Sequence, residues 1–457
     1  MPAWQCNRIQ LKEKGLVAME GSNKAMAQVP RMAYWALTAL FVMNLLNYID
    51  RYILAAVMSQ VQKDLTIDGV PGINDEQGGY LGSAFLISYS VFSPFIGWMG
   101  DRWKRKYLLA AGVGIWSLAT FGSGMATTYS HMFLARSIMG IGEATYATLA
   151  PTIIADLFTR EKRNRMLSIF YVAIPIGSAL GYGIGAQVSA GYGWPWAFYV
   201  VGLPGFFVAL AALGIPEPKR GASEEVAPDD VPTHGSMPTS WQTYKALFRN
   251  RSYLYDTLGM AFMTFAVGGL AIWTPKFLET HRDMSQQKAG TYTGIMLAVG
   301  GLLGTILGSW LADKYAGRVR GAYFWVCGLA TLAGAPFIFL TIVAQHELLI
   351  FASMGVGLTL VFAYTGPSNT IIVNVTPPNM RAAAFAVNIF AIHILGDIPS
   401  PPLMGMVSDW TRDSFWGLVI TVPALVMSGI FYCVGSRYLE SDQEAMIAGL
   451  RGRKKPA

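Results

Sequence analysis

Twelve apolar segments, each long enough to cross a lipid bilayer, constrain the fold of this chain more than any other feature. A membrane-spanning α-helix needs about 20 consecutive apolar residues, because the hydrocarbon core of a bilayer is about 30 Å thick. Only 13% of the residues are charged and 53% are hydrophobic, so we predict an all-α integral membrane protein. Continuous apolar runs favour helices over the short alternating strands of a β-barrel. The segments lie near residues 33–61, 78–100, 107–127, 131–158, 165–190, 195–215, 253–278, 289–312, 321–344, 348–375, 382–408 and 415–438.

The basic residues predict how these segments are oriented. Of the 34 Lys and Arg side chains, 27 lie in the two terminal stretches and in every second connection. Because Lys and Arg concentrate in cytoplasmic loops, both termini are predicted to be cytoplasmic in a multi-pass protein of the cell inner (plasma) membrane. The net charge of +7 forms no continuous patch, which argues against a nucleic-acid partner. The alternate connections carry only Lys63, Lys276, Arg282, Lys288 and Arg412.

One long polar connection, residues 216–252, divides the chain into two halves of six segments. It is rich in proline and acidic residues, a composition typical of a linker. Its last part, residues 241–250, is predicted to be either a short amphipathic helix on the cytoplasmic face or an irregular loop. Paired six-helix halves suggest internal repeats, as in secondary transporters. The predicted parts are a cytoplasmic tail (1–32), an N-terminal six-helix bundle (33–215), the cytoplasmic linker (216–252), a C-terminal six-helix bundle (253–438) and a second cytoplasmic tail (439–457).

Four charged side chains in the first and fourth segments form the candidate transport site. Asp50 and Arg51 are adjacent, and Arg136 and Glu143 lie seven residues apart on one helical face. They are predicted to lie roughly 8 to 18 Å below the outer helix ends, close enough to meet in one layer. A charge at that depth costs from a few to roughly ten kcal/mol unless it meets water or a partner.

Two acids and two bases cancel in charge, which lowers the cost of burying them. Protonation of Asp50 or Glu143 would then shift the balance, so either residue is a candidate proton-coupling site. The alternative is a permanent salt-bridge cluster that only locks the first helix to the fourth. Small residues could supply that packing at lower cost, and two glycine series with a spacing of four are predicted to be packing seams: Gly177, Gly181 and Gly185, and Gly300, Gly304 and Gly308.

Polar side chains on other segments indicate a cavity wall that could contact a substrate. Hydroxyl and amide groups in membrane helices also bond to neighbouring backbone, which is the alternative for each of them. His393 and Asp397 are four residues apart and precede a proline cluster that breaks or kinks the helix. This pair could relay protons or contact the substrate, or form a local structural pair. The other candidates are Asn44, Asn47, Tyr80, Ser83, Tyr89, Tyr146, Tyr364, Thr365, Ser368 and Asn369.

Metal, cofactor and enzyme sites are not predicted. Three cysteines and five scattered histidines show no metal-ligand spacing, and two cysteines lie inside apolar segments, which argues against a disulfide framework. A membrane-embedded enzyme or sensor acting on lipids would need a nucleophile–base pair or a metal cluster, and neither pattern is evident.

Two connections resemble each other and a known family signature. Gly97 to Lys106 (GWMGDRWKRK) follows the second segment, and Ser309 to Arg318 (SWLADKYAGR) follows the eighth. The first resembles the loop between helices two and three of the major facilitator superfamily. The resemblance implies contacts that break as the two halves rock; the alternative is a basic cytoplasmic loop with an incidental acid. The implied gating residues are Asp101, Arg102, Arg105, Asp313 and Lys314.

Together with Asn47 to Tyr52 (NYIDRY) and Arg136 to Ala144 (RSIMGIGEA), this loop gives the chain a resemblance to bacterial members of the Spinster family of major facilitator transporters. The resemblance implies twelve helices in two six-helix bundles and a charged cluster at Asp50, Arg51, Arg136 and Glu143. Animal relatives export sphingosine-1-phosphate or lysophospholipids, which implies proton-coupled, alternating-access transport of an amphipathic anionic lysolipid.

In such a transporter, Arg51 or Arg136 would bind the phosphate through the guanidinium fork, and the apolar second half would take the tail. Asn47, Tyr89, Tyr146, Tyr364, Asn369 and His393 are the further substrate contacts that we expect. We also expect the protein to be a monomer. A proton-coupled transporter of a water-soluble organic anion is the alternative.

Overall fold

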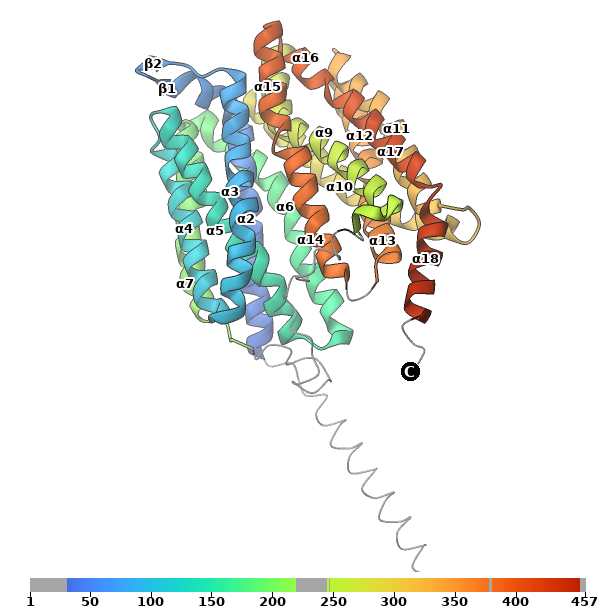
Figure 1. Cartoon of the computed structure of the whole chain (residues 1–457). Helices are drawn as coiled ribbons and strands as arrows, with labels where there is room; N and C mark the ends of the chain where they lie inside the picture. The colour runs from blue at the N-terminus through green and yellow to red at the C-terminus, as the bar shows by residue number, and fades with distance from the viewer. Residues whose placement is uncertain (1–30, 219–244, 246, 378–379, 453–457) are drawn as a thin grey trace, which may run out of the picture.

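A computed structural model describes residues 31–218, 245, 247–377 and 380–452 (Figure 1). Within these ranges, twelve helices are long and apolar enough to cross a membrane, in agreement with the sequence. In the 241–250 stretch, predicted as a short helix or an irregular loop, residues 245 and 247–250 are described, and 245 and 247–249 are helical. The N-terminal tail up to residue 30 lies outside the described residues, whereas residues 439–452 of the C-terminal tail lie within them. The helices of the first half are α2 (Arg31–Asp64), α3 (Asp75–Arg102), α4 (Arg105–Gly124), α5 (Tyr129–Leu157), α6 (Arg160–Tyr192) and α7 (Trp194–Leu213).

In the second half, the tenth, eleventh and twelfth spans are each divided into shorter pieces. The α18 helix, which follows the twelfth span, was not predicted from the sequence. The described elements after the linker are α9 (Arg251–Arg282), α10 (Gln286–Ala316), α11 (Ala322–Val343), α12 (Glu347–Phe362), α13 (Thr365–Val375), α14 (Arg381–Ile392), the π-helical turn η2 (His393–Asp397), α15 (Ser400–Thr411), α16 (Ser414–Val419), α17 (Thr421–Gly435) and α18 (Leu439–Gly452).

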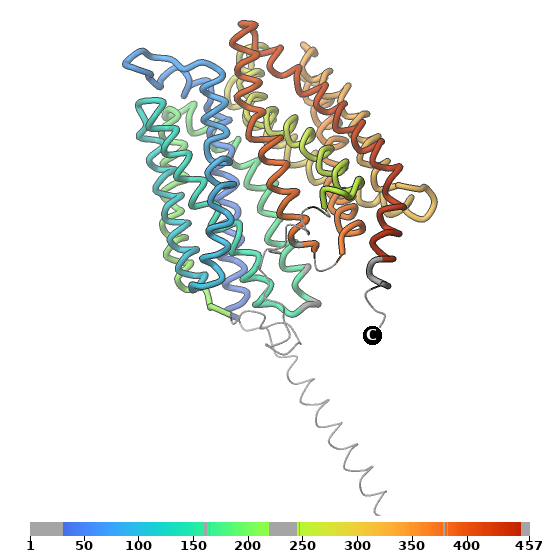
Figure 2. Tube along the Cα trace, viewed as in Figure 1, coloured from blue at the N-terminus to red at the C-terminus, as the bar shows by residue number. Residues whose placement is uncertain are grey.

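The helices form two groups that follow the order of the chain. Helices α2 to α7, blue to green, make one group, and the helices from α9 onward, yellow to red, make the other (Figures 1 and 2). One end of the molecule carries the antiparallel hairpin β1 (Thr66–Ile67) and β2 (Val70–Pro71), whose turn residues Asp68 and Gly69 both have positive φ. We call it the hairpin end. The opposite end, where α2 begins and α18 ends, is the terminal end (Figure 1).

Interruptions in the second half have local causes in the sequence. Pro399 caps α15, and the π-helical turn η2 comes directly before it, which confirms the predicted break in the eleventh span. π-Helical turns within α-helices are frequent at functional sites. His393 and Asp397, the first and last residues of this π-helical turn, are therefore candidates for a functional role.

The two glycine series lie at close helix contacts, as predicted. A Cβ atom added to Gly181 of α6 would lie 2.5 Å from the carbonyl oxygen of Ile49 on α2. A Cβ added to Gly308 of α10 would lie 1.9 Å from the carbonyl oxygen of Ala363, in the break between α12 and α13. Neither position can take a side chain unless the backbones separate. The first contact fixes the turn of α2 that carries Asp50 and Arg51.

Candidate functional site

The two halves are joined at the hairpin end by charged contacts. Lys276 of α9 donates to Asp75 at the start of α3, and both side chains are largely buried. The Asp409 carboxylate of α15 accepts the backbone N–H groups of Asp75 at 3.0 Å and Glu76 at 2.8 Å. An acid at a helix N-terminus satisfies unpaired N–H groups and the helix dipole. We call Asp75, Lys276 and Asp409 the hairpin-end lock.

A polar cleft of about 550 Å³ lies beside the lock. Two contacts between the halves border it: the Ser59 hydroxyl donates to Glu279, and the Gln60 amide donates to Gln286 at 2.7 Å. Sequence reasoning missed these residues and the lock. The usable signal was Lys276, one of the few basic residues in the alternate connections.

Arg51 and Glu143 form the central ion pair of the first half. The Arg51 Nε lies 2.6 Å from the Glu143 Oε2, and Glu143 is completely buried, whereas the Arg51 side chain is 17% exposed. The guanidinium carbon stacks over the rings of Tyr48, Phe85 and Tyr89 at 4.9, 5.3 and 5.5 Å. The Arg51 guanidinium is thus positioned by an ion pair with Glu143 and by contacts with the three aromatic rings.

Asp50 and Arg136 lie in the interior next to that pair. Asp50 accepts a hydrogen bond from the Thr120 hydroxyl of α4, a partner that the sequence analysis did not identify. Arg136 lies over the Phe85 ring at 5.0 Å and donates to the Met139 sulfur at 3.3 Å. The structure therefore brings the four predicted charges together, with the direct ion pair between Arg51 and Glu143.

Several buried polar atoms of this cluster have no hydrogen-bond partner among the described residues. They are Asp50 Oδ1 and the Nε and Nη2 atoms of Arg136. An unsatisfied buried group typically costs about 1–3 kcal/mol, and more when it is charged. A cluster of such groups is suited to a change of protonation or partner, because its present pairing leaves acceptors and donors free.

Tyr89 connects this cluster to the second half. Its ring contacts the His393 ring edge-on at a centroid distance of 6.1 Å, and the Arg51 guanidinium lies over the same ring at 5.5 Å. His393 Nδ1 lies 2.9 Å from the Asp397 carboxylate, and both side chains are about one-fifth exposed. Arg51, Tyr89, His393 and Asp397 thus form a partly accessible polar line between the halves, which we call the central site.

Three predicted substrate contacts lie elsewhere. Tyr146 is buried in the core of the first half, where its hydroxyl donates to the Leu40 carbonyl at 3.2 Å. Tyr364 lies inside the second half, with its ring 6.4 Å from that of Tyr432. Asn369 is exposed, and its amide donates to the Thr365 carbonyl of its own helix at 2.6 Å. The contacts of Tyr146 and Asn369 match the backbone-bonding alternative considered for such residues, whereas the Tyr364 ring packs against another ring.

The predicted gating residues lie at the terminal end. Arg102 is exposed and stacks over Trp98 at 4.3 Å. Asp313 accepts a hydrogen bond from Tyr323 at 3.1 Å, and Lys314 stacks over a tryptophan of its own helix at 4.6 Å. Asp101 is exposed at the end of α3. These contacts of Arg102, Asp313 and Lys314 each join residues of the same half.

Arg105 differs because it is buried and ties three parts of the first half together. It pairs with Asp156 of α5 at 2.6 Å and with Glu217, after α7, at 3.1 Å, and it donates to the Pro218 carbonyl.

We expect Arg105→Ala to lower the free energy of unfolding by about 3 kcal/mol, because two acids would lose their cation. Thermal unfolding in detergent, with exposed Arg102→Ala as control, measures this; equal midpoints for the two variants would contradict it.

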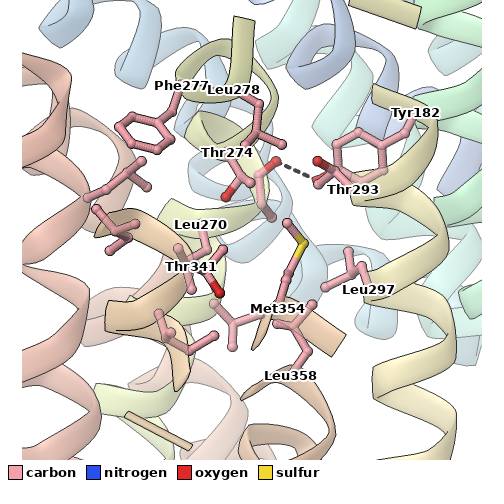
Figure 3. Close-up of a pocket in the computed structure, with 15 residues that line it drawn as sticks. Tyr182, Leu270, Thr274, Phe277, Leu278, Thr293, Leu297, Thr341, Met354 and Leu358 are labelled. Carbon is pink, nitrogen blue, oxygen red and sulfur yellow. Dashed lines mark hydrogen bonds between the residues drawn. The ribbon is translucent and has the colours of Figure 1, made fainter. Parts of the chain in front are cut away.

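An apolar pocket lies in the second half, against the first (Figure 3). Its free volume is about 30 Å³, so it is narrow as it stands. Tyr182 of α6 closes one side and donates its hydroxyl hydrogen to the Ala271 carbonyl of α9 (Figure 3). The Tyr182 ring also packs at 5.0 Å from that of Tyr52, the neighbour of Arg51. The other lining residues include Leu270, Phe277, Leu297, Ile338, Met354 and Leu358.

Comparisons with known proteins agree with this architecture. A model of the Major Facilitator Superfamily matches residues 40–401. The chain is 35% identical to Protein spinster homolog 3 of Danio rerio, over 91% of this chain and 87% of that protein. It is 34% identical to Sphingosine-1-phosphate transporter SPNS2 of Mus musculus, over 88% of this chain and 76% of that protein.

A solved structure of a bacterial homologue of the human lysosomal transporter Spinster, inward-facing and unoccupied, has the same fold. Its TM-score is 0.81 at 23% identity, covering 91% of this chain and 99% of that chain. The predicted fold and family are therefore confirmed, and the relatives indicate a transporter rather than an enzyme. The chain belongs to the major facilitator superfamily and is a membrane transporter of the Spinster type.

Proposed function

We propose that this protein transports an amphipathic anionic lysolipid across the cell inner membrane by alternating access, coupled to protons, with both termini in the cytoplasm. The observation that supports it most is the partly exposed Arg51 guanidinium, held between the halves by a fully buried acid. A phosphate accepts two parallel hydrogen bonds from such a fork. The relative named as a sphingosine-1-phosphate transporter fits the same chemistry, since that substrate joins a phosphate to a single chain.

The apolar pocket supports a lipid rather than a water-soluble anion. It adjoins the first half through Tyr182, which packs on the residue next to Arg51. A single acyl chain could enter such a pocket from a head group bound at Arg51, once side chains such as Met354 move aside. A hydrophilic organic anion would use Arg51 but would gain nothing from these lining residues.

Proton coupling follows from the pairing of Arg51 with Glu143. An ionised Glu143 occupies the guanidinium fork; protonation removes its charge and frees Arg51 to bind phosphate. Asp50 offers a second position for the proton, since one of its oxygens lacks a partner among the described residues. In this proposal, the contacts of the hairpin-end lock would keep that side closed, and the substrate would exchange through the terminal end.

Two variants test the coupling. In proteoliposomes with an imposed pH gradient, we expect Glu143→Gln or Asp50→Asn to transport a fluorescent lysolipid at a rate that no longer responds to the gradient. Each substitution fixes the neutral form of one carboxyl while keeping its size. An unchanged response in both variants would contradict the assignment. In the same assay, competition by unlabelled lysolipid but not by sugar acids is expected; the reverse order would favour the organic-anion alternative.

A further inference from the structure

A third buried carboxyl lies in the second half, away from the four charges of the first. Asp256 of α9 is 0% exposed. Its Oδ1 accepts a hydrogen bond from the Ser368 hydroxyl of α13 at 2.7 Å. Its Oδ2 is buried without a hydrogen-bond partner among the described residues. A carboxyl in this position requires an explanation, because an ionised, unpaired carboxylate in the interior costs several kcal/mol.

No positive charge faces Asp256 among the described residues. The titratable groups that act on it or feel its charge are Tyr253 on its own helix, Cys327 on α11, Tyr364 and Tyr432. Each of these groups is neutral or becomes an anion when it titrates, so none can balance a carboxylate. The charge must be removed instead by a bound proton or a bound cation.

Tyr432 of α17 supplies the complementary group. Its hydroxyl is buried and lies in hydrogen-bonding contact with Ser368, the residue that donates to Asp256 Oδ1. Gly259, one turn after Asp256, leaves the space for it: a Cβ there would lie 2.9 Å from the phenol ring. A protonated Oδ2 can donate to this hydroxyl while Oδ1 accepts from Ser368, which gives both carboxyl oxygens a partner. A metal-like cation would need more oxygen ligands than these side chains offer.

We propose that Asp256 is a proton-binding site of the second half, with the proton on Oδ2 shared with the Tyr432 hydroxyl. The neutral acid hydrogen-bonds α9 to both α13 and α17. It thereby fixes the position of α13, which is the part of the interrupted tenth span nearer the terminal end. Tyr364 lies between this site and the central site, since its ring contacts Tyr432 and it feels the charges of both Asp256 and Asp397. The proposal does not depend on the substrate or on Asp50 and Glu143.

Infrared spectroscopy of the purified full-length protein tests it without any transport assay. A protonated carboxylic acid has a carbonyl stretch distinct from that of a carboxylate, and the stretch shifts in D₂O. We expect the wild-type protein at neutral pH to show such a band, which Asp256→Asn removes. The control Asp283→Asn, an exposed acid directly after the same helix, should retain it. Equal spectra for wild type and Asp256→Asn would overturn the proposal.

Thermal unfolding separates a proton from a cation. Asn keeps one donor and one acceptor, so we expect Asp256→Asn to melt within about 2 °C of wild type and Asp256→Ala to melt lower. Added sodium or potassium should not change the wild-type midpoint. Stabilisation of the wild type by either ion, lost in Asp256→Asn, would identify a cation site and overturn the proposal. Loss of pH coupling in Asp50 variants would leave both measurements unaffected.

Discussion

Arg51→Ala is expected to lower the affinity for a lysolipid phosphate by about 100-fold, the largest effect of any single substitution in the central site. Charge-assisted hydrogen bonds contribute about 1.5–3 kcal/mol, and the fork supplies two of them. Arg51→Lys should fall between wild type and Arg51→Ala, because lysine keeps the charge but loses the planar fork. Binding of a fluorescent lysolipid to purified protein measures both effects.

Loss of binding must be separated from loss of folding. Arg51→Ala leaves Glu143 buried without its partner, which can destabilise the first half by several kcal/mol. The double variant Arg51→Ala/Glu143→Gln removes that unpaired charge and should restore thermal stability but not binding. Arg318→Ala, at an exposed arginine of the terminal end, is the matched control. Wild-type affinity in the double variant would show that Arg51 does not bind the phosphate.

The sequence predicted the spans and the charged cluster because both depend on local chemistry. Runs of apolar residues are visible along the chain, and a charge inside such a run stands out. The same rule could have found Asp256, which was overlooked because it lies near the start of the seventh segment, where an acid can be mistaken for part of a connection.

Other features could not be predicted because they depend on tertiary packing. Nothing local to Thr120 shows that its hydroxyl will bond to Asp50, seventy positions earlier in the chain. In the sequence, Tyr146 and Tyr89 look equivalent, because each is a polar side chain in an apolar segment. Only packing decides that Tyr146 donates to the backbone of α2 whereas Tyr89 contacts His393 across the halves.

The hairpin-end lock also could not be predicted without the three-dimensional structure, although each of its residues lies near the start or end of a helix. Asp75 begins one helix, Lys276 lies near the end of another, and Asp409 lies near the end of a third, so neither spacing nor motif relates them. An alternating-access transporter must close one end when the other opens. A lock of this kind should therefore set the population of the two conformations, since a contact made in only one state shifts the equilibrium by its own free energy.

Lys276→Met is accordingly expected to raise, by about tenfold, the population of the conformation in which the interface between the halves is open at the hairpin end. Lys276 and Asp75 are mostly but not fully buried, so their contact should contribute about 1.4 kcal/mol, between the surface and buried limits. The opening can be detected with a cysteine at Thr293 in a variant whose native cysteines have been replaced. Thr293 is buried, and its hydroxyl has no partner in the described residues, so the substitution breaks no hydrogen bond. The labelling rate of this cysteine with a membrane-impermeant thiol reagent is the measurement.

The matched control is Lys288→Met, because that lysine lies at the same end but pairs with Glu347 inside the second half. Both substitutions remove one positive charge near the hairpin end, so a general electrostatic effect on the reagent would appear in both. Only loss of a contact between the halves should open the interface. Equal labelling rates for the two variants would show that the ion pair between Asp75 and Lys276 has no influence on the conformational equilibrium. A faster rate in Lys276→Met alone would place the control of that equilibrium at the contact between α3 and α9.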